Sequence, residues 1–278
     1  MQPLIATAAL ARRIDRVELA LMLGVADAAR AAGGSDVHAW PVGGAAAVFV
    51  ERGSPCNKVL GLGLDGAPVE ADLAAIERAY AARGARVQVE FATLGDAGVA
   101  ALLCARGYRL TGFENVLARR LAAVPGRAST AVTVAPVGEA DAGVWLDAVT
   151  SAFLSPDGFD GPAAHESFDR AVLERTLTLM SAVPGTLRLL ARLEGRAAGG
   201  ASLFVHDGIA VLCSAATLPA CRRPGVQSAL LAARLALAHE RGCELAVVTT
   251  QPGSKSQENV QRAGFELVYS RAVLVREP

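Results

Sequence analysis

The chain has 278 residues, of which 52% are hydrophobic and 19% are charged, a composition that excludes an intrinsically disordered protein. Its 27 basic residues equal its 27 acidic residues, so we expect no nucleic-acid partner, which would require a basic surface. The length predicts about two domains, at roughly 150 residues each. No apolar run approaches the ~20 residues of a membrane helix, and no basic segment precedes the apolar stretch at the N-terminus. We therefore expect a cytoplasmic protein without a membrane partner.

The cysteines are odd in number and widely spaced, which indicates reduced thiols and neither a zinc site nor a redox motif. They are Cys56, Cys104, Cys213, Cys221 and Cys243. We expect no bound metal. Arginine far outnumbers lysine, which is typical of a GC-rich genome and favours a bacterial source.

The first half begins with an amphipathic stretch, residues 12–32, which predicts a helix packed on a neighbouring element. Apolar residues at i, i+4, i+7 and i+11 then predict the buried face of a second helix: Val69, Leu73, Ile76 and Tyr80. Gly84 ends this helix, and a β-rich run at 86–91 follows. A short helix, the turn Gly107-Tyr108 and a last strand complete the half.

The second half follows a stretch of small residues with Pro125 and Gly126, which predicts a linker at 123–130. We expect helices at 140–153, at 164–180 and through Val226, Leu230, Ala233 and Leu237. Strands are expected at 131–136, 187–193, 198–206, 209–217 and 244–250. A loop rich in Gly, Pro and Asp, 155–162, separates the first two helices.

The two halves repeat each other. Arg83-Gly84 matches Arg241-Gly242 at an offset of 158 residues, and Gly107-Tyr108 matches Gly264-Phe265 at an offset of 157. An ordered set of matches at a nearly constant offset indicates duplication. We therefore predict an α/β (α+β) fold with domains at 1–122 and 131–278, separated by the linker.

The segment that carries chemistry runs from Ile209 to Leu231, where a strand enters a basic loop and then an amphipathic helix. Free backbone N–H groups and the positive end of a helix make such a loop an anion site. Arg222 and Arg223 add charge for a phosphate, and Gly225 allows the phosphate to approach the backbone.

This loop resembles the acyl-CoA loop of the GCN5-related N-acetyltransferase (GNAT) superfamily, Gln/Arg-x-x-Gly-x-Gly/Ala, which lies between a strand and a helix. Here it reads Arg222-Arg223-Pro224-Gly225-Val226-Gln227. Gln227 departs from the pattern, and Pro224 lacks an N–H donor. The resemblance implies two tandem GNAT-like domains, each a mixed, mostly antiparallel sheet flanked by helices. It also implies acetyl-CoA as cofactor, bound by Leu218, Arg222, Arg223, Gly225, Val226, Gln227, Ser228 and Asn259.

The corresponding turn of the first half, Gly61 to Leu73, has no arginine. Its Asp65, Glu70 and Asp72 would repel a pyrophosphate. The resemblance therefore implies that the N-terminal domain is a degenerate copy.

Many family members place a tyrosine, the usual general acid, where this chain has Val260. The resemblance therefore implies no general acid at that position. Tyr269 is a candidate acid, although an aromatic residue in a terminal strand is more often core. Glu166 and His165 are candidate bases, because they lie where the family often builds its acceptor wall. Phe153 and Thr250 are candidate substrate contacts. Phe159 and Phe168 are further candidates for the acceptor pocket, and Thr249 and Gln251 for substrate contact. His206 and Asp207 are candidate bases, although a solvated turn also explains them. Cys213, next to Ser214 on the strand before the loop, is a candidate nucleophile, although a buried thiol also explains it. Ser254 and Gln257 fit a helix capping box.

The leading hypothesis is an N-acetyltransferase that transfers an acetyl group directly to a small-molecule amine in a ternary complex. The alternative is a non-catalytic acyl-CoA-binding or scaffold protein. A different nucleotide-binding enzyme is a third possibility, but the loop lacks the Gly-Lys-Ser/Thr ending and the three spaced glycines that such enzymes need. A monomer, with the two domains as a pseudo-dimer, and a homodimer are both compatible with the sequence.

Overall fold

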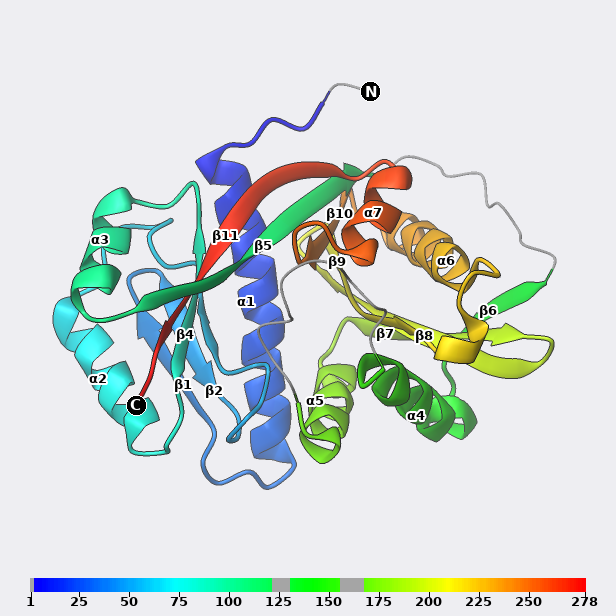
Figure 1. Cartoon of the computed structure of the whole chain (residues 1–278), viewed down its shortest axis with the longest axis horizontal. Coiled ribbons are helices and arrows are strands. Elements are labelled where there is room, and N and C mark those ends of the chain that lie inside the picture. Colours follow the sequence, from blue (N-terminus) through cyan, green and yellow to red (C-terminus); the bar gives the residue numbers. More distant parts are fainter. Residues whose placement is uncertain (1–2, 122–130, 156–167) are drawn as a thin grey trace.

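The computed structural model describes residues 3–121, 131–155 and 168–278. The described strands form one eleven-stranded sheet with the order β1-β2-β3-β4-β11-β5-β10-β9-β8-β7-β6 (Figure 1). The pairs β3–β4 and β9–β10 are parallel, and the other eight are antiparallel. The expected α/β fold with a mixed, mostly antiparallel sheet is thus confirmed.

The first half supplies three helices and five strands. Its helices are α1 (Ala8–Ala31), α2 (Glu70–Ala81) and α3 (Ala97–Ala105). Its strands are β1 (His38–Val42), β2 (Ala45–Phe49), β3 (Lys58–Leu60), β4 (Val87–Ala92) and β5 (Arg109–Arg120). The buried face expected for α2 is confirmed for Leu73, Ile76 and Tyr80, but not for Val69, which precedes the helix as its N-cap and is 62% exposed.

The described residues of the second half form four α-helices and six strands. Its helices are α4 (Ala142–Phe153), α5 (Arg170–Ala182), α6 (Val226–Glu240) and α7 (Lys255–Arg262). Its strands are β6 (Val132–Pro136), β7 (Thr186–Leu193), β8 (Arg196–His206), β9 (Ile209–Thr217), β10 (Leu245–Thr250) and β11 (Glu266–Arg276). The helix expected at 164–180 begins at Arg170, because the Asp169 side chain caps it by accepting the backbone N–H groups of Ala171 and Val172.

The last strand of each half pairs with the other half. β5 pairs with β11 over residues 109–118 and with β10 over residues 115–120, and β11 also pairs with β4. Leu117 of β5 consequently lies in the hydrophobic core of the second half, and Leu274 of β11 lies in that of the first. The division at 123–130 falls outside the described residues and stays a prediction. Each half therefore needs a strand of the other half: β11 lies beside β4 of the first half, and β5 lies beside β10 of the second.

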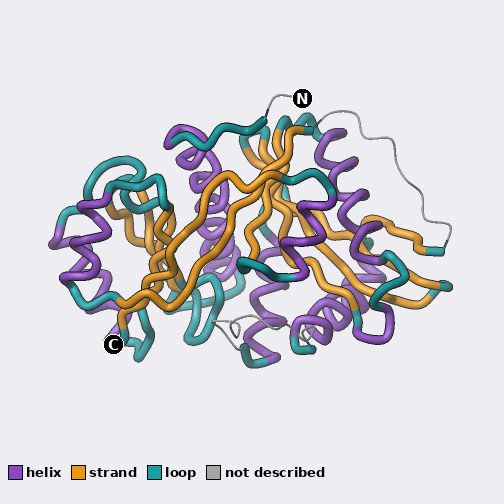
Figure 2. The backbone as a smooth tube through the Cα atoms, turned by 45° about the horizontal axis from the view of Figure 1, so that its top comes forward, coloured by secondary structure: helices purple, strands orange, loops and turns teal. Residues whose placement is uncertain are grey.

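Helices cover both faces of the sheet (Figure 2). Side chains alternate along each strand: Phe204, Val211 and Val247 pack with α1, whereas Leu203, Leu212 and Val248 pack with α6. The helices α1, α4 and α5 therefore lie on one face, and α2, α3, α6 and α7 lie on the other. Since α1 contacts strands of both halves as well as α5, it ties the halves together across the centre (Figure 1). No described helix is long and apolar enough to cross a membrane.

Candidate functional site

The parallel strands β9 and β10 pair only at their beginnings. Residues 209–211 lie opposite residues 245–247, but β9 continues to Thr217 and β10 to Thr250 without further pairing. Ser214 has a left-handed backbone (φ 49°), and the register of β9 with β8 shifts around it. Such a bulge bends a strand. The result is an open end between residues 212–217 and 248–250, which we call the β9–β10 fork.

The loop after β9 leads directly to the start of α6. Leu218 follows the strand and is held by its N–H bond to the Ala198 carbonyl. A short 3-10 turn at 219–221 comes next, and Gly225 then caps α6 in the left-handed conformation (φ 90°). No side chain of the described residues caps this helix, and the first backbone bond of the helix is from the Ala229 N–H to the Gly225 carbonyl. The N–H groups of Val226, Gln227 and Ser228 are thus available to an anion.

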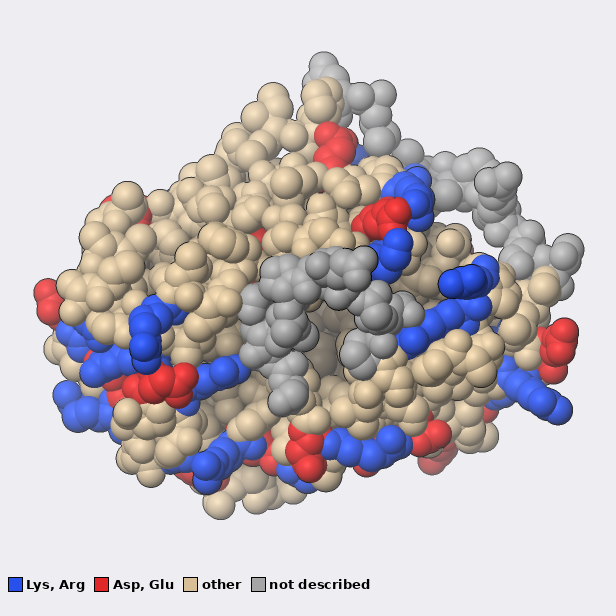
Figure 3. Space-filling view, in the orientation of Figure 1, with Lys and Arg blue, Asp and Glu red and all other residues tan. Residues whose placement is uncertain are grey.

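The two arginines of this loop differ in their surroundings. Arg223 is exposed, whereas the Arg222 guanidinium is half-buried and donates to the Ser155 carbonyl at the end of α4. Gln227 accepts a long bond, 3.4 Å, from the Thr217 hydroxyl. Basic side chains gather over the start of α6 and over α7 on the face shown in Figure 3. This surface suits a phosphate group.

Helix α7 lies beside α6 and carries Asn259. Asn259 is half-buried, and its amide makes no hydrogen bond to another described residue. Ser254 caps the helix as expected, accepting the Gln257 N–H at 3.2 Å. The Gln257 side chain instead accepts the N–H of Gly253, one residue before the position that a capping box requires. Val260 is only 4% exposed and packs in the core, so no hydroxyl occupies the family's tyrosine position.

The equivalent region of the first half is filled by its own side chains. Asp65 forms ion pairs with Arg12 at 2.5 Å and with Arg16 at 2.9 Å. A Cβ atom at Gly63 would lie 2.8 Å from the Phe91 ring, so the turn is packed against that ring. The turn of the first half therefore has a carboxylate, Asp65, where the loop of the second half has arginines, and a carboxylate repels an anion.

The candidate acid Tyr269 is buried on the α1 face. Its hydroxyl donates to the Asp15 carboxylate and lies 3.3 Å from an Arg271 nitrogen. Burial raises the pKa of Tyr269 well above 10, so the phenol stays protonated. Among the other candidates, Phe153 is 44% exposed at the end of α4, and Thr250 is 5% exposed with a hydroxyl that has no described partner.

Several weaker candidates are also placed. His206 and Asp207 are exposed in a turn. Burial raises the pKa of Cys213 to about 11, which leaves it a poorly nucleophilic thiol at neutral pH. Phe168 is half-buried. Glu166, His165 and Phe159 lie outside the described residues. In the described part of the chain, no three His, Cys, Asp or Glu side chains gather as metal ligands would.

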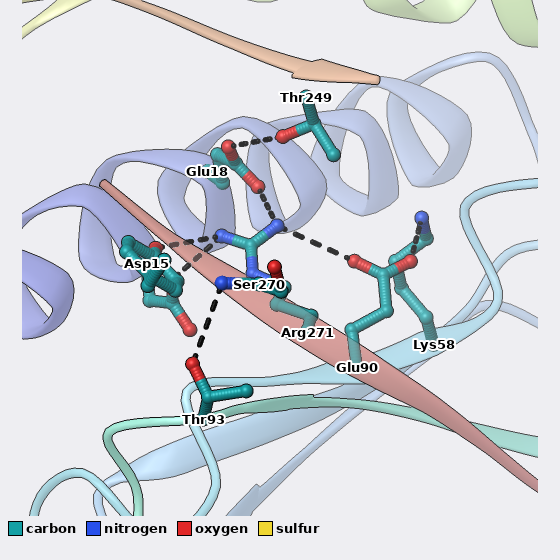
Figure 4. Close-up of polar contacts among 9 residues, drawn as sticks. Asp15, Glu18, Lys58, Glu90, Thr93, Thr249, Ser270 and Arg271 are labelled. Atoms are coloured by element: carbon teal, nitrogen blue, oxygen red, sulfur yellow. Dashed lines mark hydrogen bonds and ion pairs between the residues drawn. The ribbon is translucent and has the colours of Figure 1, made fainter. Parts of the chain in front are cut away.

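A buried ionic cluster on the α1 face escaped the sequence interpretation (Figure 4). At its centre, the Arg271 guanidinium binds Asp15 at 2.5 Å and Glu18 at 2.6 Å, both from α1. Glu90 of β4 lies 3.6 Å from the same guanidinium and also pairs with Lys58. The signal was present, since Glu90 and Arg271 interrupt apolar strands, and Asp15 and Glu18 lie at i, i+3 on the apolar face of a helix.

The cluster reaches the β9–β10 fork. The second oxygen of Glu18 accepts the Thr249 hydroxyl at 3.1 Å, and Thr249 is two residues beyond the last β10 residue that pairs with β9. Glu114 of β5 lies opposite Arg271 in the β5–β11 register, and burial, with the negative charge of Glu90, raises its pKa to about 8.

Comparisons with known proteins agree with this geometry. Residues 153–265 match the Acetyltransferase (GNAT) family. A GCN5-related N-acetyltransferase from Kribbella flavida is similar in fold, with 20% identity, a TM-score of 0.63, and coverage of 90% of this chain and 95% of that one. A GCN5-related N-acetyltransferase from Sphaerobacter thermophilus has 18% identity and a TM-score of 0.58, covering 79% and 71%.

A tandem GNAT protein from the clavulanic acid biosynthesis pathway has 17% identity and a TM-score of 0.56, covering 84% of this chain and 78% of that one. No curated protein sequence matches the chain. The second half carries the family match, and the whole chain shares the fold of the similar structures.

Proposed function

We propose that the protein is an acyl-CoA-dependent N-acetyltransferase that transfers an acetyl group from acetyl-CoA directly to the amine of a small molecule. One observation carries the proposal: α6 begins at a left-handed glycine, without a side-chain cap, immediately after a strand that diverges from its parallel neighbour. This arrangement offers a phosphate site and an open pair of strands side by side.

In this proposal the pyrophosphate of acetyl-CoA lies against the N–H groups of Val226, Gln227 and Ser228, next to Gly225. Arg223 contributes charge from the surface, and Arg222 does so while joining the loop to α4. Leu218 places the loop beside β8, and Asn259 supplies a free amide for the cofactor arm. Acetyl-CoA supplies an activated thioester.

The fork supplies the remaining features. Among the described residues, β9 and β10 have no strand partner on their facing edges beyond residues 211 and 247, so N–H groups on these edges are free to polarise a thioester carbonyl. The acceptor amine must be neutral to attack, which requires a group that removes its proton. Phe153 and Thr250 remain proposed acceptor contacts.

Calorimetric titration of the protein with acetyl-CoA, with ATP and NAD as controls, tests the cofactor. Gly225→Leu should weaken acetyl-CoA binding at least tenfold, because the side chain would occupy the phosphate position. Gly66→Leu is a matched control: both glycines have positive φ and open space where a Cβ atom would lie, but Gly66 lies in the first half's turn. Equal effects of the two substitutions, or no effect of either, would contradict the loop assignment.

Val260 favours one alternative, a protein that binds acyl-CoA without catalysis, because the position that would carry the acid is apolar and buried. Tight binding of acetyl-CoA without thiol release, across a broad panel of amines, would support this alternative.

A further inference from the structure

The two sides of the β9–β10 fork are covered by different halves of the chain. The loop at Gly225 and helix α6 lie on one face of the sheet, where the cofactor phosphates are proposed to bind. Helix α1 of the first half crosses the opposite face, on the same side as α4 and α5. An acceptor that meets the thioester from the side opposite α6 therefore meets α1.

One side chain of α1 is at the fork itself. Glu18 accepts the Thr249 hydroxyl through one oxygen and the Arg271 guanidinium through the other. Its side chain is 12% exposed, compared with 1% for Asp15 and 2% for Glu90. Of these three carboxylates, Glu18 is the one that retains contact with solvent, and it does so beside the open end of β10.

We propose that Glu18 is the general base for the acceptor amine, so that the N-terminal half supplies a catalytic residue to the acetyltransferase site of the C-terminal half. This inference rests on the proposed function and deepens it. It also assigns the acceptor to the cationic primary amines, because the α1 face of the site has an excess of carboxylates. The groups that face Glu18 from its own and neighbouring elements are Asp15 (α1), Lys58 (β3), Glu90 (β4), Glu114 (β5), Cys213 (β9), Thr249 (β10), and Tyr269 and Arg271 (β11).

The geometry suits a base held in one orientation. Arg271 favours the ionised form of the carboxylate and holds it in place, while Asp15 binds the other end of the same guanidinium and accepts the Tyr269 hydroxyl. Burial, which outweighs the attraction of Arg271, raises the pKa of Glu18 above its ordinary value of 4.5. A carboxylate with a raised pKa is a stronger base at neutral pH.

The proton balance is complete. A cationic amine gives one proton to Glu18, and its free lone pair attacks the thioester carbonyl carbon. The carbon–nitrogen bond forms as the carbon–sulfur bond breaks, and the second amine proton passes through solvent to the leaving sulfur. Glu18 then returns its proton to water. The products are the N-acetyl amine, CoA as a free thiol and one proton.

The test compares Glu18→Gln with Glu77→Gln. Glu77 is also a buried carboxylate held by two arginines, Arg106 and Arg276, but it lies on α2, on the opposite face of the sheet. Both changes remove a buried ionic contact, so both should lower the melting temperature. Only Glu18→Gln should lower kcat for acetyl transfer by at least about 100-fold, the usual range for loss of a general base, with acetyl-CoA affinity unchanged.

The assay measures CoA thiol release with spermidine, tyramine and lysine methyl ester as probes. The wild-type rate should fall at acidic pH as Glu18 is protonated, and this fall should disappear in Glu18→Gln. Thr249→Val is a milder second variant, because it removes one hydrogen-bond donor to the Glu18 carboxylate. This loss should raise the pKa of Glu18, so the fall of the rate at acidic pH should begin at a higher pH while the protein stays folded.

The outcomes separate the two proposals. No binding of acetyl-CoA to the wild-type protein would overturn the proposed function. Binding without turnover of any of the probes would overturn the assignment of Glu18 and of cationic acceptors. Two results would show that Glu18 only joins α1 to β11 through its ion pair. One is a kcat that Glu18→Gln lowers by less than threefold. The other is a fall of the rate at acidic pH that Thr249→Val leaves at the same pH.

Discussion

Leu117 gives a direct test of the strand exchange. It belongs to the first half by sequence but is 0% exposed in the core of the second, and it lies opposite Val248 of β10. Replacing a fully buried leucine by alanine costs roughly 3 kcal/mol, from lost burial and from the cavity that remains. For a chain of this size that cost corresponds to a fall in melting temperature of roughly 6–12 °C.

The matched variant is Leu73→Ala, because Leu73 is also 0% exposed but lies in the core of the first half. Differential scanning calorimetry should show one unfolding transition that both variants shift by similar amounts, since the exchanged strands couple the two cores. Leu110→Ala, at a side chain that is 54% exposed, should change the melting temperature little. Two separate transitions, with Leu117→Ala and Leu73→Ala moving different ones, would refute the coupling.

Three further predictions concern single groups. Glu114 has a folded pKa of about 8, above its ordinary 4.5, so it takes up a proton on folding, and its contribution to stability falls as pH rises from 4.5 to 8. Glu114→Gln should therefore raise the melting temperature relative to wild type at pH 8 but not at pH 4.5; a pH-independent difference would contradict this pKa. Arg223→Ala should weaken acetyl-CoA binding by about tenfold, the effect of losing one charged contact, and more so at low salt; unchanged calorimetric affinity would exclude Arg223 from the site. Iodoacetamide should label the exposed Cys104 well before Cys213, whose pKa is about 11, as peptide mass spectrometry can check; the reverse order would indicate a reactive Cys213.

Local patterns were sufficient for most elements. The apolar spacing of α2 and α6 predicted where those helices begin to within one residue, and the β-rich runs of β9 and β10 predicted both ends of those strands to within one residue. The loop before α6 was identified because its basic residues, its glycine and the following helix are consecutive in the chain. Such a site depends on backbone geometry within a few residues, and Gly225 adopts the left-handed conformation that the loop requires.

Other features depend on residues that are far apart in sequence. Asp15 and Glu18 meet Arg271 across more than 250 residues, and no local periodicity indicates this contact. Tyr269 was a candidate acid from its position in the sequence, and only the fold shows that its hydroxyl donates to Asp15. Long-range ion pairs of this kind form only where the fold buries each charge beside a partner, because an unpaired buried charge is strongly unfavourable.

By itself, the sequence determined the fold class, the duplicated order of elements and the position of the candidate anion loop, because periodicity, turn residues and capping act over a few residues. The tertiary structure alone decided that β5 and β11 change places, that α1 crosses the face behind the fork and that Glu18 lies beside Thr249. Strand pairing joins backbone N–H and C=O groups, which every strand has. The hydrogen bonds alone would therefore allow β4 to pair with β5 of its own half or with β11 of the other. The packing of Leu117 and Leu274 in the cores of the opposite halves, and of α1 and the buried ionic cluster across the centre, shows which arrangement the chain adopts.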